Sequence, residues 1–367
     1  MLFKIYKNTK VFLTGHTGFK GSWLGLWLHN LGAKVYGYSL KPNTKINHFD
    51  LLGGERLYED SYFSDINDKV KLEKALINSD PEIIFHLAAQ PLVRKSYQDP
   101  YNTFQTNTIG TLNILNISRK LKNLKAIVLI TTDKVYKNKE WLWGYRENDT
   151  LGGYDPYSAS KACAELVIDS MRQSFFNVND FGSKHQILIA SARAGNVIGG
   201  GDWSEDRLIP DIIKACVCNK KVEIRNPNST RPWQHVLEPL YGYLLLGIKL
   251  LQGHSEFATS FNFGPEVSGN LTVDEVLKIA KKFWDKISYQ CKVDLNAPHE
   301  ANLLMLDASK AKKMLPWNLF FTSEESIKMT IEWYRSFYNE GNIISTAQLN
   351  NLINRYNLES FLINESK

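Results

Sequence analysis

The chain has 367 residues, of which 43% are hydrophobic and 22% are charged, proportions that suit an ordinary globular protein. This length is enough for one large domain or two closely joined ones with a sizeable core. The formal net charge of +6 is spread along the chain instead of being gathered in a basic tract, which argues against a nucleic-acid-binding protein.

The first half of the chain alternates short apolar runs with helical patterns. The predicted strands are the apolar runs at 11–14, 34–38, 83–85, 127–130 and 187–190. Helices are predicted at 19–31 and at about 106–121. This repetition predicts an α/β fold: a Rossmann-type, doubly wound parallel sheet with helices on both faces. Right-handed crossovers then place the carboxyl ends of all strands at one edge, where ligands bind.

The second half is less regular and predicts a smaller mixed α/β C-terminal lobe. It contains turn clusters at 199–202 and 226–228, and helical stretches at 239–251, 272–284 and 323–338. We therefore expect a Rossmann domain over 1–195, rejoined by about 236–265, and a second lobe built from 196–235 and 266–340 that completes a cleft. No function is assigned to the C-terminal tail, 341–367.

A glycine triplet, Gly15-x-x-Gly18-x-x-Gly21, falls between the first predicted strand and its helix. Glycines there allow a tight turn and let backbone N–H groups and the helix N-terminus approach a pyrophosphate, so a dinucleotide site is predicted. The second strand closes without the acidic residue that would grip a ribose and repel a 2′-phosphate. This leaves NAD or NADP open, and Lys41 would even favour NADP. Asp65 would hold the adenine amino group or simply start a helix.

Two further segments carry polar groups suited to acid–base chemistry. Tyr157 and Lys161 lie one helical turn apart after a good helix start at Asp155-Pro156. An ammonium beside a phenol favours the phenolate, so the pKa of Tyr157 is expected to fall toward the working range. Thr131-Thr132-Asp133-Lys134 follows an apolar strand at the ligand edge of the sheet. Either a catalytic group or a polar loop cap would fit that second segment.

The sequence offers no signal for membrane insertion, secretion or metal binding. No apolar stretch reaches the about 18 residues of a membrane span, and the first ten residues lack an apolar signal core. Cys216 and Cys218 are too close for a CxxC motif and have no histidine nearby, so reduced thiols, a cytoplasmic location and no metal site are expected.

From about Val11 to Tyr338 the chain resembles the extended short-chain dehydrogenase/reductases, and within them the CDP-glucose 4,6-dehydratase family. The broader group is indicated by the glycine triplet, Leu87-Ala88-Ala89, Asn107-x-x-Gly110-Thr111, Tyr157-x-x-x-Lys161 and Arg193-x-x-Asn196-Val197-x-Gly199. The narrower one is indicated by the strings at 15–23, 132–136, 200–203 and 231–236. Lys134 is informative, since dTDP-glucose and GDP-mannose relatives usually carry glutamate there.

The resemblance implies a set of binding residues and NAD as the cofactor. The implied dinucleotide contacts are Gly15, His16, Thr17, Gly18, Phe19, Lys20, Gly21, Asp65, Ile66, Leu87, Ala88, Ala89, Asn107, Thr131, Tyr157 and Lys161. The implied substrate contacts are Gln90, Thr132, Asn196, Arg207 and Arg231, with the arginines suited to a diphosphate through their bidentate donors. The superfamily also implies a homodimer or homotetramer.

The implied reaction is the dehydration of CDP-glucose to its 4-dehydro-6-deoxy form. Tyr157 would take the C4 hydroxyl proton while Thr132 bonds the C4 oxygen, and the resulting ketone would make the C5 proton acidic. Lys134 would then remove that proton as Asp133 protonates the departing C6 hydroxyl, and the hydride taken from C4 would return to C6. The alternatives are a dehydratase of a dTDP-, UDP- or GDP-linked sugar, a nucleotide-sugar epimerase or simple dehydrogenase, or a dinucleotide sensor without activity.

Overall fold

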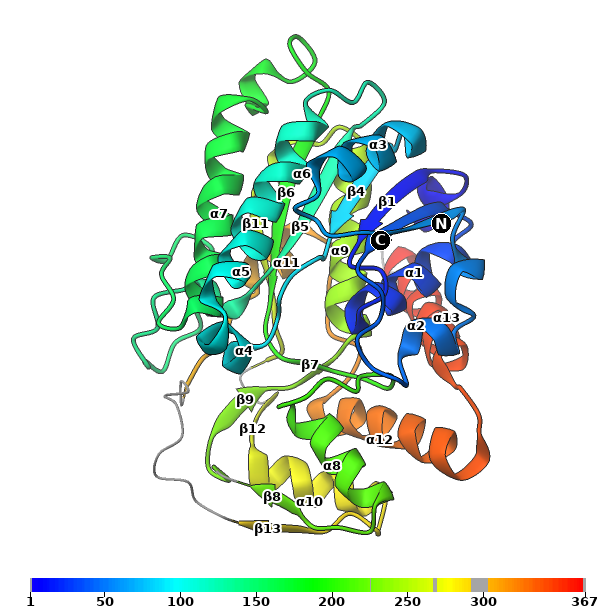
Figure 1. Ribbon diagram of the computed structural model, residues 1–367. Helices are drawn as coiled ribbons and strands as arrows, with labels where there is room; N and C mark the ends of the chain where they lie inside the picture. The colour runs from blue at the N-terminus through cyan, green and yellow to red at the C-terminus, as the bar shows by residue number, and fades with distance from the viewer. Residues whose placement is uncertain (1, 225, 267–268, 292–302, 366–367) are drawn as a thin grey trace.

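A parallel sheet forms the centre of the computed structural model, which describes residues 2–224, 226–266, 269–291 and 303–365. Its 7 strands lie in the order β11-β6-β5-β4-β1-β2-β3 (Figure 1). Their bounds are β1 Lys10–Thr14, β2 Lys34–Ser39, β3 Asp60–Phe63, β4 Ile83–His86, β5 Ala126–Thr132, β6 Leu188–Ala194 and β11 Ser260–Phe263. Since every neighbouring pair is parallel, the predicted Rossmann-type, doubly wound sheet is confirmed.

Helices cover both faces of this sheet because its strands are apolar on both sides. Along β1, Val11 and Leu13 belong to one core and Phe12 to the other. The first core is closed by α1 (Phe19–Asn30) and α9 (Leu237–Leu251), and the second by α3 (Lys69–Ser79), α6 (Gly110–Ser118) and α7 (Pro156–Ser174) (Figure 1). The chain thus leaves this layered part after β6 and returns to it for α9 and β11.

The predicted helix at 106–121 is divided in the structure. A short helix α5 (Pro100–Phe104) runs into a π-helical turn, η3 (Gln105–Ile109), before α6 begins at Gly110. Proline at the first position of α5 and the Asp99 side chain, which accepts from the Asn102 N–H, explain why the helical stretch begins earlier than predicted. The remaining short elements before the second lobe are η1 Leu2–Tyr6, α2 His48–Leu51, η2 Gly54–Leu57, α4 Val93–Gln98, η4 Asp133–Val135 and η5 Val178–Asp180.

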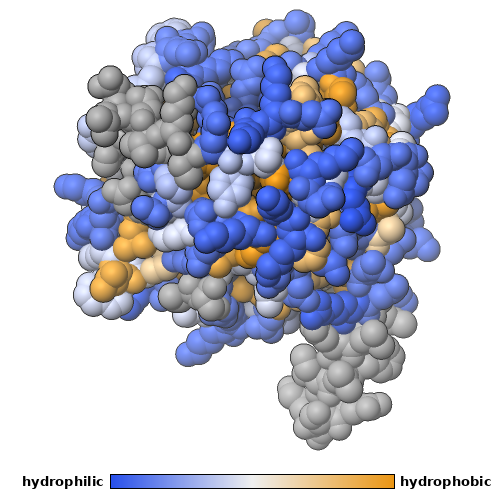
Figure 2. All heavy atoms as spheres, turned by 90° about the horizontal axis from the view of Figure 1, so that it is seen from below, coloured by the Kyte–Doolittle hydropathy of each residue, from blue (hydrophilic) through white to orange (hydrophobic). Residues whose placement is uncertain are grey.

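The second lobe lies below the carboxyl edge of the sheet in Figure 1. Two of its helices, α10 and α12, begin with capping boxes. Seen from below, its side of the molecule is mostly hydrophilic and its apolar residues form small, separate patches (Figure 2). Its elements and those that join it to the sheet are β7 Val197–Ile198, α8 Leu208–Val217, β8 Val222–Ile224, β9 Thr230–Pro232, β10 Gln234–His235, η6 Ser255–Phe257, β12 Asn270–Thr272, α10 Val273–Phe283, β13 Tyr289–Cys291, α11 Ser309–Met314 and α12 Ser323–Glu340.

The tail, to which the sequence analysis assigned no function, forms a helix that packs on the core. In α13 (Ser345–Glu365), Leu349 and Leu352 are buried in the same apolar core as α1. The Ser345 hydroxyl hydrogen-bonds the His48 ring and accepts from the Trp333 indole, both at 2.8 Å. The tail helix therefore packs in the core that contains α1 and is joined by hydrogen bonds to α2 and α12. Among the residues that the structure describes, no helix is long and apolar enough to span a membrane.

Candidate active site

A cavity of about 1990 Å³ runs along the carboxyl edge of the sheet, between the Rossmann domain and the second lobe. Most of the residues predicted from the sequence line it: Gly15, Thr17, Gly18, Phe19, Lys20, Gly21, Asp65, Ile66, Leu87, Ala88, Ala89, Gln90, Thr131, Thr132, Lys134, Tyr157, Lys161, Asn196 and Arg207. His16, Asn107 and Asp133 are buried behind its wall. The Arg231 side chain lies outside the described residues, although its backbone belongs to β9.

The three loop glycines each meet a different steric demand. A Cβ on Gly15, whose φ is +73°, would lie 2.8 Å from the Ala88 nitrogen, and one on Gly21 would lie 2.0 Å from the Gly15 oxygen. A Cβ on Gly18 would meet only the Gly15 oxygen at 3.3 Å, so a ligand can approach this backbone closely. The helix α1 starts there without a side-chain cap, which leaves its first N–H groups for an anion. This cradle fits the pyrophosphate of a dinucleotide.

The His16 side chain points away from this cradle. Its ring is fully buried among Phe49, Tyr58 and Phe63 and lies 2.6 Å from the Ser61 hydroxyl. If His16 contacts a dinucleotide, it therefore does so through its backbone.

The end of the cavity next to the carboxyl end of β2 is lined by polar side chains and few charged ones. The Thr17 hydroxyl bonds Ser39 at 2.9 Å and the Leu40 carbonyl at 2.8 Å, which ties the glycine loop to that strand. The Lys41 ammonium lies 5.7 Å from the centre of the Phe63 ring, and the Asp65 carboxylate accepts from the Asn67 N–H at 2.8 Å. Ser39, Leu40 and Lys41 line the cavity at the end of β2, and none of these three carries a carboxylate, so the choice between NAD and NADP stays open on geometry.

Two of the predicted residues hold the cavity wall in place. The Asn107 amide accepts from the Gln90 N–H at 2.8 Å and donates to the Ser160 hydroxyl at 2.9 Å, which ties the loop after β4 to α7. The Gln90 side chain bonds Leu92 and Thr103, within its own part of the wall. Asn107 is thus a positioning residue in this structure, and Gln90 reaches the cavity with its polar end already engaged.

Tyr157 and Lys161 lie in the first two turns of α7, and both are largely buried at the cavity wall. The Lys161 ammonium donates to the Ile130 carbonyl at 3.2 Å instead of facing the phenol. Burial raises the pKa of Tyr157 to about 12, against a lowering effect of the hydrogen bond with Thr132. The expected fall in the tyrosine pKa is therefore wrong for this state, because desolvation outweighs the nearby charges.

The end of β5 and the turn after it bring Thr132 and Lys134 to the cavity wall, with Asp133 buried directly behind it. The Thr132 hydroxyl donates to the Asp133 carboxylate at 2.8 Å and accepts from the Lys134 N–H at 3.3 Å. Gly195 leaves room for that carboxylate, since a Cβ there would lie 3.1 Å from the Asp133 Oδ2. Thr132 and Asp133 both interact with Tyr157. The Thr132 hydroxyl also forms the polar cap that was the alternative interpretation.

Three cations lie near one another in the cavity. Lys20, Lys161 and Arg207 are all close enough to interact, and burial with these cations lowers the pKa of Lys20 to about 8 despite the opposing Asp133. Arg207 is the N-cap residue of α8 and forms an ion pair with Asp202 at 2.8 Å. Lys20 therefore reaches past the dinucleotide cradle toward the catalytic segment, which the glycine motif alone did not indicate.

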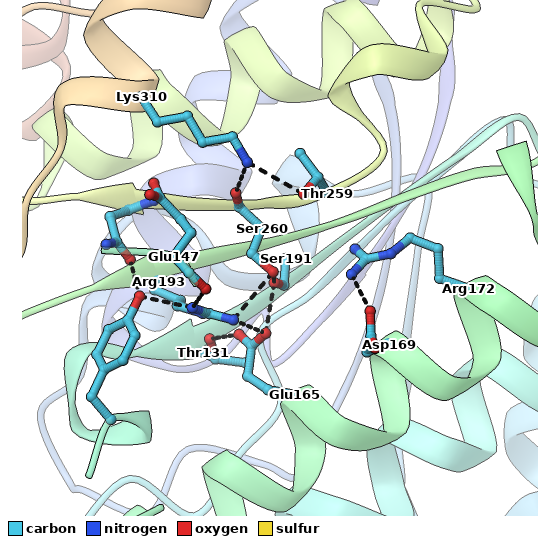
Figure 3. Close-up of polar contacts among 12 residues, drawn as sticks. Thr131, Glu147, Glu165, Asp169, Arg172, Ser191, Arg193, Thr259, Ser260 and Lys310 are labelled. Atoms are coloured by element: carbon cyan, nitrogen blue, oxygen red, sulfur yellow. Dashed lines mark hydrogen bonds and ion pairs between the residues drawn. The ribbon is translucent and has the colours of Figure 1, made fainter. Parts of the chain in front are cut away.

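Sequence reasoning gave no role to Glu165, which lies one turn after Lys161 on α7. Its carboxylate forms a buried ion pair with Arg193 at 2.8 Å, behind the cavity wall (Figure 3). The signal that could have found it is its position, four residues after Lys161 on the same helical face.

Comparison with known proteins gives a consistent group of relatives. The model of the family described as GDP-mannose 4,6 dehydratase matches residues 12–330. A CDP-glucose 4,6-dehydratase of Salmonella typhimurium is 46% identical over 332 residues, which cover 90% of this chain and 92% of that relative.

Solved structures share the fold at lower identity. A UDP-glucose 4-epimerase of Thermotoga maritima, solved with UDP-glucose, gives a TM-score of 0.74 at 22% identity and covers 89% of this chain and 98% of its own. A UDP-glucuronic acid 4-epimerase of Bacillus cereus, solved with UDP-glucuronic acid and NAD, gives 0.75 at 20% identity, with 90% and 100% covered.

Proposed function

The chain belongs to the GDP-mannose 4,6-dehydratase family, and we propose that it dehydrates CDP-glucose to CDP-4-dehydro-6-deoxyglucose with bound NAD. The observation that carries the reaction type is one cavity lined by the glycine cradle, Tyr157, Lys161, Thr132 and Lys134, with Asp133 buried directly behind its wall. The 46% identity to a CDP-glucose 4,6-dehydratase supports the sugar nucleotide. An epimerase or a plain dehydrogenase would not require the Asp133–Lys134 pair.

We assign each step to residues of the cavity wall. Tyr157 accepts the C4 hydroxyl proton, which requires its phenolate, and Lys161 favours that form when its ammonium turns from the Ile130 carbonyl toward the phenol. Thr132 bonds the C4 oxygen. Lys134 removes the C5 proton that the C4 ketone has made acidic, and Asp133 protonates the leaving C6 hydroxyl. Bound NAD supplies the hydride acceptor and donor for this sequence.

The binding residues divide between the two ends of the cavity. The Gly15–Gly21 loop, Asp65, Ile66 and the wall after β4 hold the dinucleotide. Asn196 and Arg207 face the sugar nucleotide diphosphate, and Lys20 contributes a further positive charge between the two pyrophosphates.

We predict that the protein forms a 4-dehydro-6-deoxy sugar nucleotide without accumulating NADH. Oxidation at C4 and reduction at C6 use the same hydride, so the cofactor is regenerated in each turnover. The measurement is product analysis with CDP-glucose at catalytic NAD, with NADH absorbance followed in parallel. NADH formed in equal amount to product would exclude the dehydratase, and a C4 epimer that keeps its C6 hydroxyl would identify an epimerase.

The same assay, run with different nucleotide-linked glucoses, identifies the nucleotide that the enzyme prefers. We expect kcat/KM to be highest for CDP-glucose among the CDP-, dTDP-, UDP- and GDP-linked glucoses, by at least about tenfold, which corresponds to about 1.4 kcal/mol of discrimination. A clear preference for another base would place the chain beside the dTDP- or GDP-sugar dehydratases while keeping the reaction type.

A homodimer or homotetramer and a cytoplasmic location stay predictions. The dimer is supported by exposed apolar side chains on helices that pack together: Tyr97 on α4, Tyr101 on α5 and Leu166 on α7.

A further inference from the structure

Three neighbouring strands present polar side chains to the buried face of α7, directly behind the catalytic segment. Thr131 on β5 pairs in register with Arg193 on β6, and Ser191 on β6 pairs with Ser260 on β11. Residues paired in a parallel sheet face the same side, so these four side chains form one layer beneath the helix (Figure 3).

Glu165 on α7 closes this layer. One carboxylate oxygen accepts from the Thr131 hydroxyl, and the other accepts from the Ser191 hydroxyl at 2.9 Å and the Arg193 guanidinium at 2.8 Å. The Arg193 and Glu165 side chains are only 4% and 2% exposed. Burial alone would raise the pKa of Glu165, but Arg193 and these hydrogen bonds hold it below its usual range, so the carboxylate is charged.

The same ion pair reaches the other end of the catalytic segment. The Arg193 guanidinium donates to the Tyr136 hydroxyl at 2.7 Å, and that hydroxyl donates to the Asn262 amide oxygen at 2.8 Å. Glu165 therefore holds residue 131 and Arg193 holds residue 136. Between these two residues lie Thr132, Asp133 and Lys134, to which the proposed function gives the contact with the C4 oxygen, the acid and the base.

Glu165 also acts on Lys161, one turn before it on α7. The two side chains hold adjacent residues of β5, since Lys161 donates to the Ile130 carbonyl and Glu165 accepts from Thr131. Burial lowers the pKa of Lys161 to about 8, and the Glu165 charge opposes that fall. The other ionisable groups that interact with Lys161 are His86 on β4 and Lys20 on α1.

We propose that Glu165 and Arg193 are positioning residues whose buried ion pair fixes both ends of the Thr131–Tyr136 segment and so aligns its acid and base with Tyr157 and Lys161. Neither side chain lines the cavity. A buried ion pair is weak support for a role in stability, because apolar residues of similar size often serve as well. The ion pair contacts both ends of one catalytic segment, and this points to a role in aligning the side chains of that segment. The proposal rests on the proposed function.

The test replaces Glu165 with glutamine, which keeps the shape and removes the charge. Its matched control is Asp169→Asn on the same helix, where the carboxylate pairs with Arg172 at 2.8 Å outside this layer (Figure 3). We expect kcat to fall about 100-fold in Glu165→Gln with KM changed less than about threefold, because misalignment affects the transition state more than binding. The control should keep wild-type kcat and KM.

The pH profile separates alignment from general damage. Lys161 acts as the ammonium, so activity is lost as the pH rises through its pKa. Removing the Glu165 charge lowers that pKa further, and the alkaline limb of kcat should move to lower pH by about one unit. An unmoved limb together with wild-type kcat would overturn the proposal.

Two further measurements keep the test decisive. Amide hydrogen exchange needs no substrate, and in Glu165→Gln it should be at least about tenfold faster across residues 131–136 but unchanged in β1. Unchanged exchange at 131–136 would contradict the proposal that the ion pair fixes this segment, even if the proposed reaction proved wrong. Should Glu165→Gln fail to fold, Tyr136→Phe removes the contact with Arg193 together with the hydrogen bond to Asn262, and we expect it to lower kcat about tenfold with the alkaline limb unmoved. Wild-type kcat in that variant would count against the proposal that the ion pair fixes this segment.

Discussion

Replacing Lys134 by methionine is expected to stop the removal of the C5 proton while oxidation at C4 continues. Lys134 lines the cavity beside Asp133, and its amide is fixed by the Thr132 hydroxyl. Methionine fills a similar volume but cannot accept a proton. We expect overall turnover to fall at least about 100-fold, the usual contribution of a positioned acid or base.

Two readouts of the partial reaction make this prediction specific. Lys134→Met should give transient NADH absorbance with CDP-glucose, and it should not exchange the C5 hydrogen with deuterium from solvent. Asp133→Asn should show the opposite defect, since it keeps that exchange and loses the C6 hydroxyl slowly. Exchange at the wild-type rate in Lys134→Met would show that another group is the base.

Lys20 is the second candidate for the base, because its ammonium interacts with Asp133. Lys20→Met should keep C5 exchange and weaken the binding of NAD or of CDP by about tenfold, the value of one charge-assisted hydrogen bond. Loss of C5 exchange in Lys20→Met, with exchange retained in Lys134→Met, would transfer the base to Lys20.

The second large effect is expected for Tyr157→Phe. The phenol lies in the first turn of α7 at the cavity wall, and it is the group to which we assign the C4 hydroxyl proton. Its removal should lower kcat about 1,000-fold and abolish both the NADH transient and C5 exchange, since both depend on the C4 ketone.

Binding distinguishes this chemical defect from a structural one. Calorimetry with CDP should give a Kd within about threefold of wild type, since the lost hydroxyl contributes to proton transfer more than to affinity. Tyr36→Phe, on β2 and outside the cavity lining, is the control that should leave all readouts unchanged. An NADH transient of normal size in Tyr157→Phe would contradict the assignment.

Features that depend on local spacing could be predicted from the sequence. The glycine cradle is one, since Gly15, Gly18 and Gly21 meet their steric demands within seven residues of chain. The shared helical face of Tyr157 and Lys161 is another, because a helix places residues four apart on one side. The parallel, doubly wound sheet was predicted in the same way, from alternating apolar runs and helical patterns.

Features that depend on partners far apart in the sequence could not be predicted from it. Glu165 and Arg193 are 28 residues apart and meet only because α7 packs over the β5–β6 pair. The direction of the Lys161 ammonium, toward the Ile130 carbonyl, is likewise set by packing. That direction and the burial of Tyr157 explain why the expected fall in the tyrosine pKa is wrong. The tail helix depends on the buried contacts of Ser345 with His48 and Trp333, which no local pattern indicates.

The most direct test of the account is the fate of the hydrogen at C4. CDP-glucose carrying deuterium at C4 should yield a 4-dehydro-6-deoxy product with that deuterium at C6, in ordinary water and with unlabelled NAD, because the same hydride leaves one carbon and returns to the other within one cavity. Mass spectrometry and NMR of the product locate the label. Retention of deuterium at C6 is the predicted result. Product that lacks deuterium, or a C4-epimerised sugar with its C6 hydroxyl intact, would contradict it.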